Sequence, residues 1–171
     1  MSTVILDEQS NDTSAAGAEL HYRVADFYAR YAECLNDDEI EKWPDFFVED
    51  CLYKLMPRAN HDRGLPISIM LSESRGGLVD RVTAIRNTMV YAPRWTNLSI
   101  SNPRIVSRSG DIVTTHNNFT VYHTSGDGVS MLLLVGRSFD KIEVTEDRMW
   151  LVERVAIYDT ELLPATIIYP V

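Results

Sequence analysis

The sequence has no long hydrophobic segment. Its longest apolar run spans only Met131–Val135, whereas a membrane-spanning helix needs about 20 apolar residues. The N-terminal stretch, Met-Ser-Thr-Val-Ile-Leu-Asp-Glu-Gln, lacks the basic start and the apolar core of a signal peptide. These absences predict a cytoplasmic protein that does not enter a membrane.

Positive charge is also scarce. Sixteen Lys and Arg residues stand against twenty-five Asp and Glu residues, which gives a net charge of −9 and a pI near 4.8. Nucleic acids and anionic membrane surfaces both require a positively charged face on the protein. The charge balance therefore argues against either as a partner.

Cysteine is rare, and the cysteines lack metal-binding spacing. Cys34 and Cys51 are the only two, and neither has a histidine within three residues, as a Cys/His-ligated iron–sulfur cluster would need. His116 and His123 lie seven apart on one expected strand, so their side chains should point to opposite faces. We expect two thiols in a reducing compartment and no metal or cofactor bound by this chain.

Motifs for nucleophilic catalysis and phosphate binding are absent too. The sequence contains no Gly-x-Ser-x-Gly and no Gly-x-x-x-x-Gly-Lys. Only Gly76-Gly77, before an expected helix, faintly resembles a phosphate loop. The sequence thus offers no signature of a serine hydrolase or a nucleotide-binding enzyme.

The composition is that of an ordinary globular domain. Of the 171 residues, 45% are hydrophobic and 24% are charged, and a chain of this length usually forms one domain. Residues 1–16 are mostly polar and unpatterned, which predicts a flexible N-terminal arm. Residues 17–171 are expected to form the single domain.

Helical periodicity dominates the first half of that domain. One helix should run from Gly17 to Asn36, because apolar residues recur every three or four positions along it: Leu20, Val24, Phe27, Tyr31 and Leu35. Asp38 is expected to cap a short second helix that ends at Trp43, which we interpret as a core or hinge anchor. A third helix is expected over residues 78–90.

The second half is typical of a β-sheet. A first strand is expected at residues 51–56, and an extended piece at 67–71. Four more are expected near 95–108, 111–124, 129–143 and 148–160, separated by turns rich in Gly and Asp. Helices followed by an antiparallel meander predict an α+β fold. The expected layout is a cystatin-like/NTF2-like cone, in which N-terminal helices pack on a curved antiparallel sheet.

Two of these strands are apolar on both faces. In residues 150–159, Trp150, Val152, Ala156 and Tyr158 should share one face, opposite Leu151, Val155 and Ile157. The helices can cover only one face of the sheet, so a partner chain is the favoured cover for the other. The alternative is that the N-terminal arm or the tail, Pro164 to Val171, folds over it.

A cone can also enclose a pocket for acid–base chemistry. On one strand face the usable groups would be His116, Asn118 and Tyr122, with His116 as general base. The alternative is that these polar residues satisfy one another or reach an interface.

Charged residues also occur within the apolar strands. Arg137 emerges from a buried run, and Asp140 should point to the other face unless Gly136 introduces a bulge. In a regular strand, Arg137 could reach Asp159 or Glu153, while Asp140 could reach Arg154 or a basic group of a partner. Two solvated charges are the remaining alternative.

Six short motifs resemble a known family when taken in order. They are Phe27-Tyr-Ala-Arg-Tyr-Ala-Glu, Trp43-Pro-Asp-Phe-Phe-Val-Glu-Asp-Cys-Leu-Tyr, Asp80-Arg-Val-Thr-Ala-Ile-Arg, Ser101-Asn-Pro-Arg-Ile-Val, Gly136-Arg-Ser-Phe-Asp-Lys-Ile and Glu153-Arg-Val-Ala-Ile-Tyr-Asp. Over roughly residues 20–168 the chain resembles the small (beta) subunit of bacterial aromatic-ring-hydroxylating dioxygenases. The second motif is most similar to the terephthalate dioxygenase type.

This resemblance implies a non-catalytic structural subunit of a multicomponent dioxygenase. The large (alpha) subunit of such enzymes carries a Rieske [2Fe-2S] cluster and a mononuclear Fe(II), in an α3β3 hexamer. It dihydroxylates an aromatic substrate, here expected to be an aromatic acid, with O2 and NAD(P)H-derived electrons from a reductase, with or without a ferredoxin. A self-sufficient NTF2-like isomerase or dehydratase is the alternative function.

Overall fold

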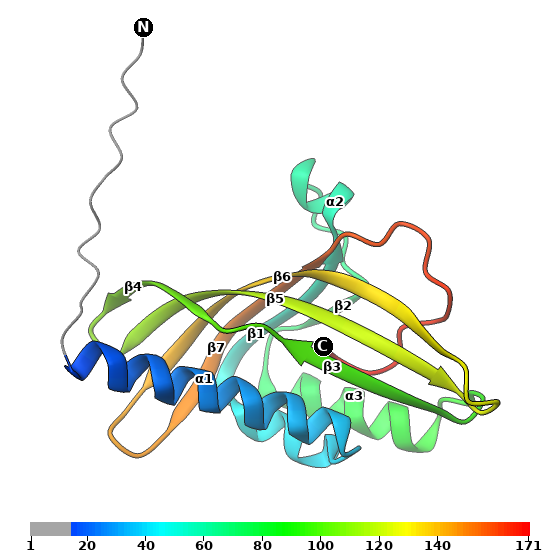
Figure 1. Ribbon diagram of the computed structural model, residues 1–171, viewed down its shortest axis with the longest axis horizontal. Helices are drawn as coiled ribbons and strands as arrows, with labels where there is room; N and C mark the ends of the chain where they lie inside the picture. Colours follow the sequence, from blue (N-terminus) through cyan, green and yellow to red (C-terminus); the bar gives the residue numbers. More distant parts are fainter. Residues whose placement is uncertain (1–14) are drawn as a thin grey trace, which may run out of the picture.

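The fold was determined as a computed structural model, which describes residues 15–171 (Figure 1). The predicted arm at residues 1–14 lies outside the described residues, and residues 15 and 16 already belong to the first helix. In chain order the elements are α1 (Ala15–Asn36), η1 (Ile40–Phe46, a 3-10 helix), β1 (Phe47–Pro57), α2 (Arg58–Asp62), β2 (Met70–Ser72), α3 (Arg75–Asn87), β3 (Arg94–Ile100), β4 (Arg104–Ser109), β5 (Ile112–Ser125), β6 (Ser130–Val144) and β7 (Met149–Tyr158).

Helix α1 buries the face that the periodicity predicted. Val24, Phe27, Tyr31 and Leu35 are almost fully buried, and Leu20 packs at the margin of the core. Helix α3 begins a turn earlier than expected, since Ser74 caps it by accepting a hydrogen bond from Gly77 N at 3.2 Å. Both helices therefore present one apolar stripe to the sheet.

The expected cap at Asp38 is wrong. Asp38 has a φ of 59°, and Glu39 occupies the N-cap position of η1 without a side-chain cap. The Asp38 carboxylate instead accepts hydrogen bonds from Arg86 Nη1 at 2.9 and 3.0 Å. Asp38 thus ties the α1–η1 turn to α3.

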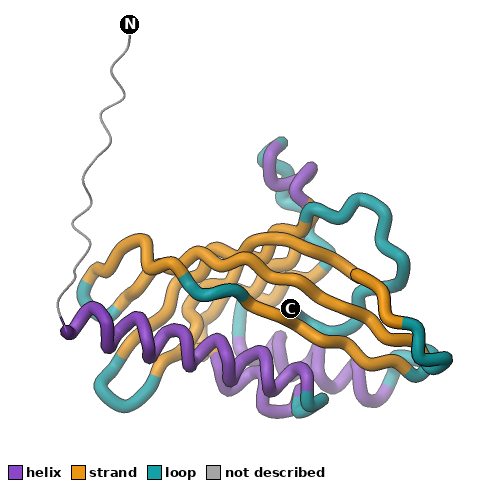
Figure 2. Tube along the Cα trace, viewed as in Figure 1, coloured by secondary structure: helices purple, strands orange, loops and turns teal. Residues whose placement is uncertain are grey.

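The sheet is mixed rather than wholly antiparallel. Its order is β2-β1-β7-β6-β5-β3, with β4 also paired to β5 (Figure 2). Tight turns join β5, β6 and β7 and make them antiparallel, but β1 runs parallel to β7. Only a long connection links β1 to β7, so no hairpin fixes their relative direction. The local sequence patterns could not reveal this pairing.

The long strand expected at residues 95–108 is interrupted. It divides into β3 and β4 around Pro103, which cannot donate a ladder hydrogen bond. Both halves pair with β5. At the turns that follow, Gly110 and Gly128 adopt the expected positive φ, 60° and 84°.

The core lies between the inner sheet face and the helices. In Figure 1, α1 and α3 lie on one side of the curved sheet, while α2 projects from the other side. We call the side with α1 and α3 the inner face and the opposite side the outer face. Strand β5 shows the division clearly, because its buried residues alternate with more exposed ones: Val113, Thr115, Asn117, Phe119, Val121 and His123.

A bulge changes the faces expected for β7. The register passes from Lys141↔Glu153 to Ile142↔Leu151, which leaves Val152 without a ladder partner. Consequently Leu151 and Ala156, expected on opposite faces, are both completely buried. Strict alternation across the strand therefore assigned part of it to the wrong side.

Candidate functional site

The centre of the inner face holds a buried polar cluster rather than an apolar floor. Asp140 on β6 and Arg154 on β7 are register neighbours, and their side chains are fully buried. Arg154 Nη1 lies 2.6 Å from Asp140 Oδ2. The sequence allowed this pairing as one of two options for Asp140, and the structure confirms it.

Three neutral donors contact the same oxygen of that carboxylate, whereas Asp140 Oδ1 is buried without a hydrogen-bond partner among the described residues. Asp140 Oδ2 accepts hydrogen bonds from Tyr28 OH at 2.7 Å, Ser138 Oγ at 3.0 Å and Asn117 Nδ2 at 3.2 Å. Thr115 shares a further hydrogen bond with Tyr28, at 2.6 Å. With Arg154, four donors therefore converge on one carboxylate oxygen.

The electrostatics of the pair favour the charged forms. Burial raises the pKa of Asp140 above its ordinary value, and Arg154 and the neutral donors offset only part of that rise. Burial lowers the pKa of Arg154, but the combined attraction of Asp140 and the nearby tyrosines outweighs it, and the result lies above the ordinary value. Hydrogen bonds donated to a carboxylate stabilise its ionised state. We therefore assign an ion pair at neutral pH.

The tail of the chain closes the interior. Val171 O accepts hydrogen bonds from Arg154 Nε at 3.0 Å and from Tyr31 OH at 2.9 Å. Upstream, Arg81 donates to Ile168 O at 2.8 Å and Arg94 donates to Thr166 O at 3.1 Å. The tail, offered as an alternative cover for the second face, thus packs within the inner side.

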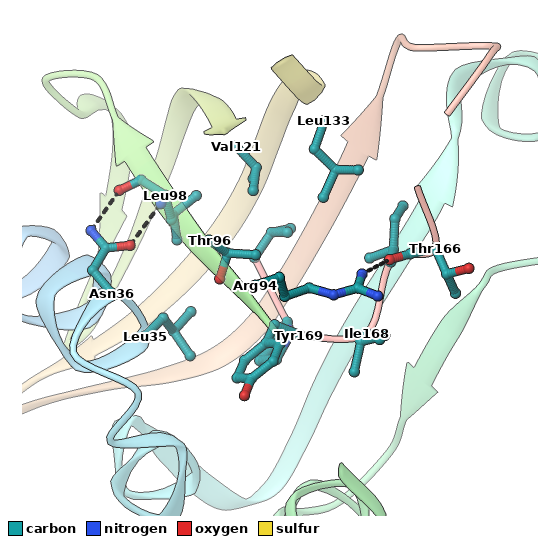
Figure 3. Close-up of a pocket in the computed structure, with 13 residues that line it drawn as sticks. Leu35, Asn36, Arg94, Thr96, Leu98, Val121, Leu133, Thr166, Ile168 and Tyr169 are labelled. Carbon is teal, nitrogen blue, oxygen red and sulfur yellow. Dashed lines mark hydrogen bonds between the residues drawn. The ribbon is translucent and has the colours of Figure 1, made fainter. Parts of the chain in front are cut away.

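Little space remains beside the tail. The cavity in Figure 3, lined by the end of α1, strand β3 and the tail, measures about 20 Å³. A single buried water needs roughly 10–15 Å³. This cavity therefore has room for a water molecule, not for an aromatic substrate.

The side chains proposed for acid–base chemistry lie on the outer face. Asn118 and Tyr122 are exposed and His116 is half-buried, with its ring edge-to-face against Phe139 at 4.6 Å. Their neighbours on β5 point inward, including His123, which is 6% exposed. His116 and His123 therefore face opposite ways, as their spacing predicted, but the expected pocket does not contain His116, Asn118 or Tyr122.

The expected partners of Arg137 are engaged elsewhere. Arg137 is exposed on the outer face, and its side chain forms no ion pair with any of residues 15–171. Asp159 pairs with Arg58 at 2.5 Å, and Glu153 pairs with Lys141 at 2.7 Å. Arg137 thus matches the alternative of a solvated charge.

Trp43 occupies the position expected of an anchor. It is 1% exposed, and its Nε1 donates to Tyr31 OH at 2.9 Å. Its ring packs edge-to-face on Phe47 and Tyr53, with centroid distances of 5.6 and 5.1 Å. Through Tyr31, this aromatic cluster also supports the hydrogen bond that holds Val171.

The outer face exposes large apolar side chains at one end of the sheet. Tyr122 and Leu132 are register partners on β5 and β6 and are 48% and 46% exposed. Trp95, on neighbouring β3, is 64% exposed. We call these three residues the outer apolar patch. Aromatic residues gathered on an exposed sheet face are typical of interaction surfaces.

Within residues 15–171, no group of three or more His, Cys, Asp or Glu side chains could hold a metal ion. Cys34 and Cys51 are both buried and free. Over the same range, no helix is sufficiently long and apolar to traverse a bilayer.

Comparison with known proteins assigns the family. A family model described as the ring hydroxylating beta subunit matches residues 30–165. The chain belongs to this family. The family predicted from the ordered motifs is confirmed, and the chain is a beta subunit of the aromatic-ring-hydroxylating dioxygenase type.

Individual relatives agree with this assignment. The small subunit of anthranilate 1,2-dioxygenase from Burkholderia cepacia is 30% identical over 142 residues, covering 83% of this chain and 88% of that protein. A terephthalate 1,2-dioxygenase beta subunit from Comamonas sp is 28% identical over 148 residues, covering 86% and 96%.

A solved structure extends the agreement to the fold. A dioxygenase beta subunit from Novosphingobium aromaticivorans superposes with a TM-score of 0.82 at 34% identity, covering 90% of this beta subunit and 97% of that chain. The predicted cystatin-like/NTF2-like layout is confirmed, although the sheet is mixed rather than wholly antiparallel.

Proposed function

We propose that this beta subunit is a non-catalytic structural component of a cytoplasmic α3β3 oxygenase. The large subunit would hold the Rieske cluster and the mononuclear iron and would dihydroxylate an aromatic acid. Electrons would come from NAD(P)H through a reductase, with or without a ferredoxin. The relatives that act on anthranilate and terephthalate support the aromatic-acid class.

The observation that carries this proposal is the contrast between the two sheet faces. The inner face is filled by helices, the ion pair and the tail, which leaves a cavity of about 20 Å³. The outer face exposes Trp95, Tyr122 and Leu132. A protein with a filled interior and an uncovered aromatic face suits assembly better than small-molecule catalysis, and obligate interfaces commonly bury more than about 2,000 Å².

The test is co-expression with the large subunit, followed by light scattering. The wild-type pair should form a hexamer. Tyr122→Ser with Leu132→Ser should weaken or abolish co-purification while leaving the melting temperature of the beta subunit within a few degrees. Tyr22→Ser is the matched control, because Tyr22 is 72% exposed on α1 and outside the outer apolar patch.

The alternative function is tested on the same complex. His116→Ala and Asn118→Ala should leave turnover per assembled hexamer unchanged, because neither side chain faces an enclosed cavity. Normal assembly with lost turnover would favour acid–base chemistry by this chain. A stable monomer that never binds the large subunit would also contradict the structural role.

A further inference from the structure

A second hollow lies outside the cone. A cleft of about 560 Å³ opens between α1, η1, the start of α3 and the hairpin that joins β6 to β7. In Figure 1 this hairpin passes beside the first half of α1. Small-molecule sites usually occupy roughly 300–1,000 Å³. The cleft therefore has the size of a ligand site, unlike the cone interior.

The cleft combines aromatic walls with positive charge. Phe27, Phe46 and Trp150 line it, and Phe46 packs edge-to-face on Phe27 at 5.7 Å. Its lining also contains four cationic side chains and two carboxylates, in a chain whose net charge is −9: Arg30, Lys42, Arg75, Arg148, Asp45 and Asp147. Asp26 and Glu39, which pair with Arg30 and Lys42, balance the remaining charge, so the cleft as a whole is close to neutral in a strongly acidic protein.

Hydrogen bonds hold the hairpin wall in place. Arg23 Nη2, from α1, donates to Thr145 O at 2.6 Å and to Glu146 O at 3.0 Å. Within the hairpin, Arg148 N donates to Thr145 Oγ1 at 3.1 Å, and Thr145 N donates to Arg148 O at 2.9 Å. These hydrogen bonds fix the hairpin wall against α1, and a fixed wall reduces the entropy cost of binding.

One cation of the cleft remains available. Arg30 pairs with Asp26 at 2.9 Å, Lys42 pairs with Glu39 at 2.6 Å, and Arg75 contacts Asp45. The exposed Arg148 side chain forms no ion pair with any of residues 15–171. It also lines a smaller adjoining hollow of about 110 Å³, so it stands where the two spaces meet.

We propose that this cleft binds a small aromatic carboxylate. The ligand ring would pack against Phe46 and Trp150, since aromatic rings favour offset or edge-to-face contact with one another. Its carboxylate would pair with Arg148, whose planar guanidinium matches the two carboxylate oxygens. Arg75, already engaged by Asp45, would border the same anion. This site does not depend on the proposed assembly, because every lining residue belongs to this chain.

Titration calorimetry on the full chain, with benzoate and 2-naphthoate as probes, tests the proposal. Both should bind with one site per chain, 2-naphthoate more tightly because it buries more ring surface, and benzamide should bind at least about tenfold more weakly. Arg148→Gln should weaken benzoate binding by at least about tenfold. Arg137→Gln is the matched control, since Arg137 is equally free of ion pairs but lies on the outer face, and it should leave binding unchanged.

Three results would overturn the proposal. One is the absence of saturable heat with either carboxylate up to about 10 mM, a concentration above most specific affinities. Another is equal binding of benzoate to Arg148→Gln and to the wild type. The third is a pair of observations: the wild type binds neither carboxylate, and Arg148→Glu no longer co-purifies with the large subunit. That result would make the cleft a contact for an acidic segment of the partner.

Discussion

Replacing Asp140 by Asn is the sharpest test of the buried cluster. The substitution keeps the size and shape of the side chain but removes its charge. Arg154 would then remain fully buried without a counter-ion, since its only ion-pair partner within residues 15–171 is Asp140. The stability cost should therefore come from an uncompensated buried charge rather than from a cavity.

The expected magnitude follows from complete burial of both partners. Breaking a buried pair by removing one member costs about 3–5 kcal/mol. Domains of this kind are stable by only about 5–15 kcal/mol in total. For a chain of 150–250 residues, that loss corresponds to a fall in melting temperature of roughly 6–20 °C. Asp140→Asn should therefore be among the most damaging polar substitutions in this protein.

The neighbouring exposed pair provides the control. Lys141 and Glu153 occupy the adjacent register position on the same two strands, 2.7 Å apart, with side chains 52% and 29% exposed. Lys141→Gln should cost less than about 1 kcal/mol, because water screens such pairs. Urea unfolding followed by far-UV circular dichroism would compare the two variants directly.

A double-mutant cycle separates the pair from its surroundings. Arg154→Met should restore part of the stability lost in Asp140→Asn, with a coupling of about 0.5–3 kcal/mol. If Asp140→Asn costs no more than Lys141→Gln, the reasoning from burial is refuted. If the losses in unfolding free energy caused by Asp140→Asn and Arg154→Met simply add in the double mutant, the direct ion pair is not the source of the effect.

Three further predictions concern packing and ionisation. Trp43→Ala should lower the free energy of unfolding, measured in urea, by about 3–5 kcal/mol, because the ring is buried; an unchanged midpoint would place the ring outside the core. Gly136→Ala should unfold at clearly lower urea than Gly126→Ala, because an added Cβ would clash with Ile157 O at the first site but only touch Pro93 O, 3.5 Å away, at the second; equal midpoints would contradict this. Burial raises the pKa of Tyr53 to about 12, so the folded chain keeps a proton that the unfolded chain releases from about pH 10. The contribution of Tyr53 to stability should thus be constant below about pH 10 and fall by up to about 1.4 kcal/mol per pH unit between pH 10 and 12, which thermal melts in that range would measure against Tyr53→Phe.

Much of the fold was accessible from sequence because it depends on local periodicity. The apolar stripe of α1 and the hairpin glycines Gly110 and Gly128 are set by side-chain spacing and by backbone conformation. The absence of metal-ligand spacing and the order of the family motifs are likewise properties of the sequence. They predicted an assembly subunit without any knowledge of contacts.

Other features depend on contacts between distant segments. The bulge at Val152 reverses which side chains of β7 face inward, and a pattern of strict alternation cannot contain it. Such a pattern also allows the alternative in which His116 faces a pocket, whereas the inward residues of β5 include Thr115 and Asn117. A shift of one residue in phase moves a whole set of side chains to the other face.

Most of the elements, the family and the unusual charges within apolar strands can be read from the sequence. Which of those charges meet depends on the tertiary structure. Asp140 and Arg154 lie fourteen residues apart and become partners because a hairpin sets their register, while Tyr28 and Val171 reach them through packing of α1 and the tail. Periodicity reports the environment of a residue along its own element, but partner choice depends on how separate elements pack, and that information is spread over the whole chain.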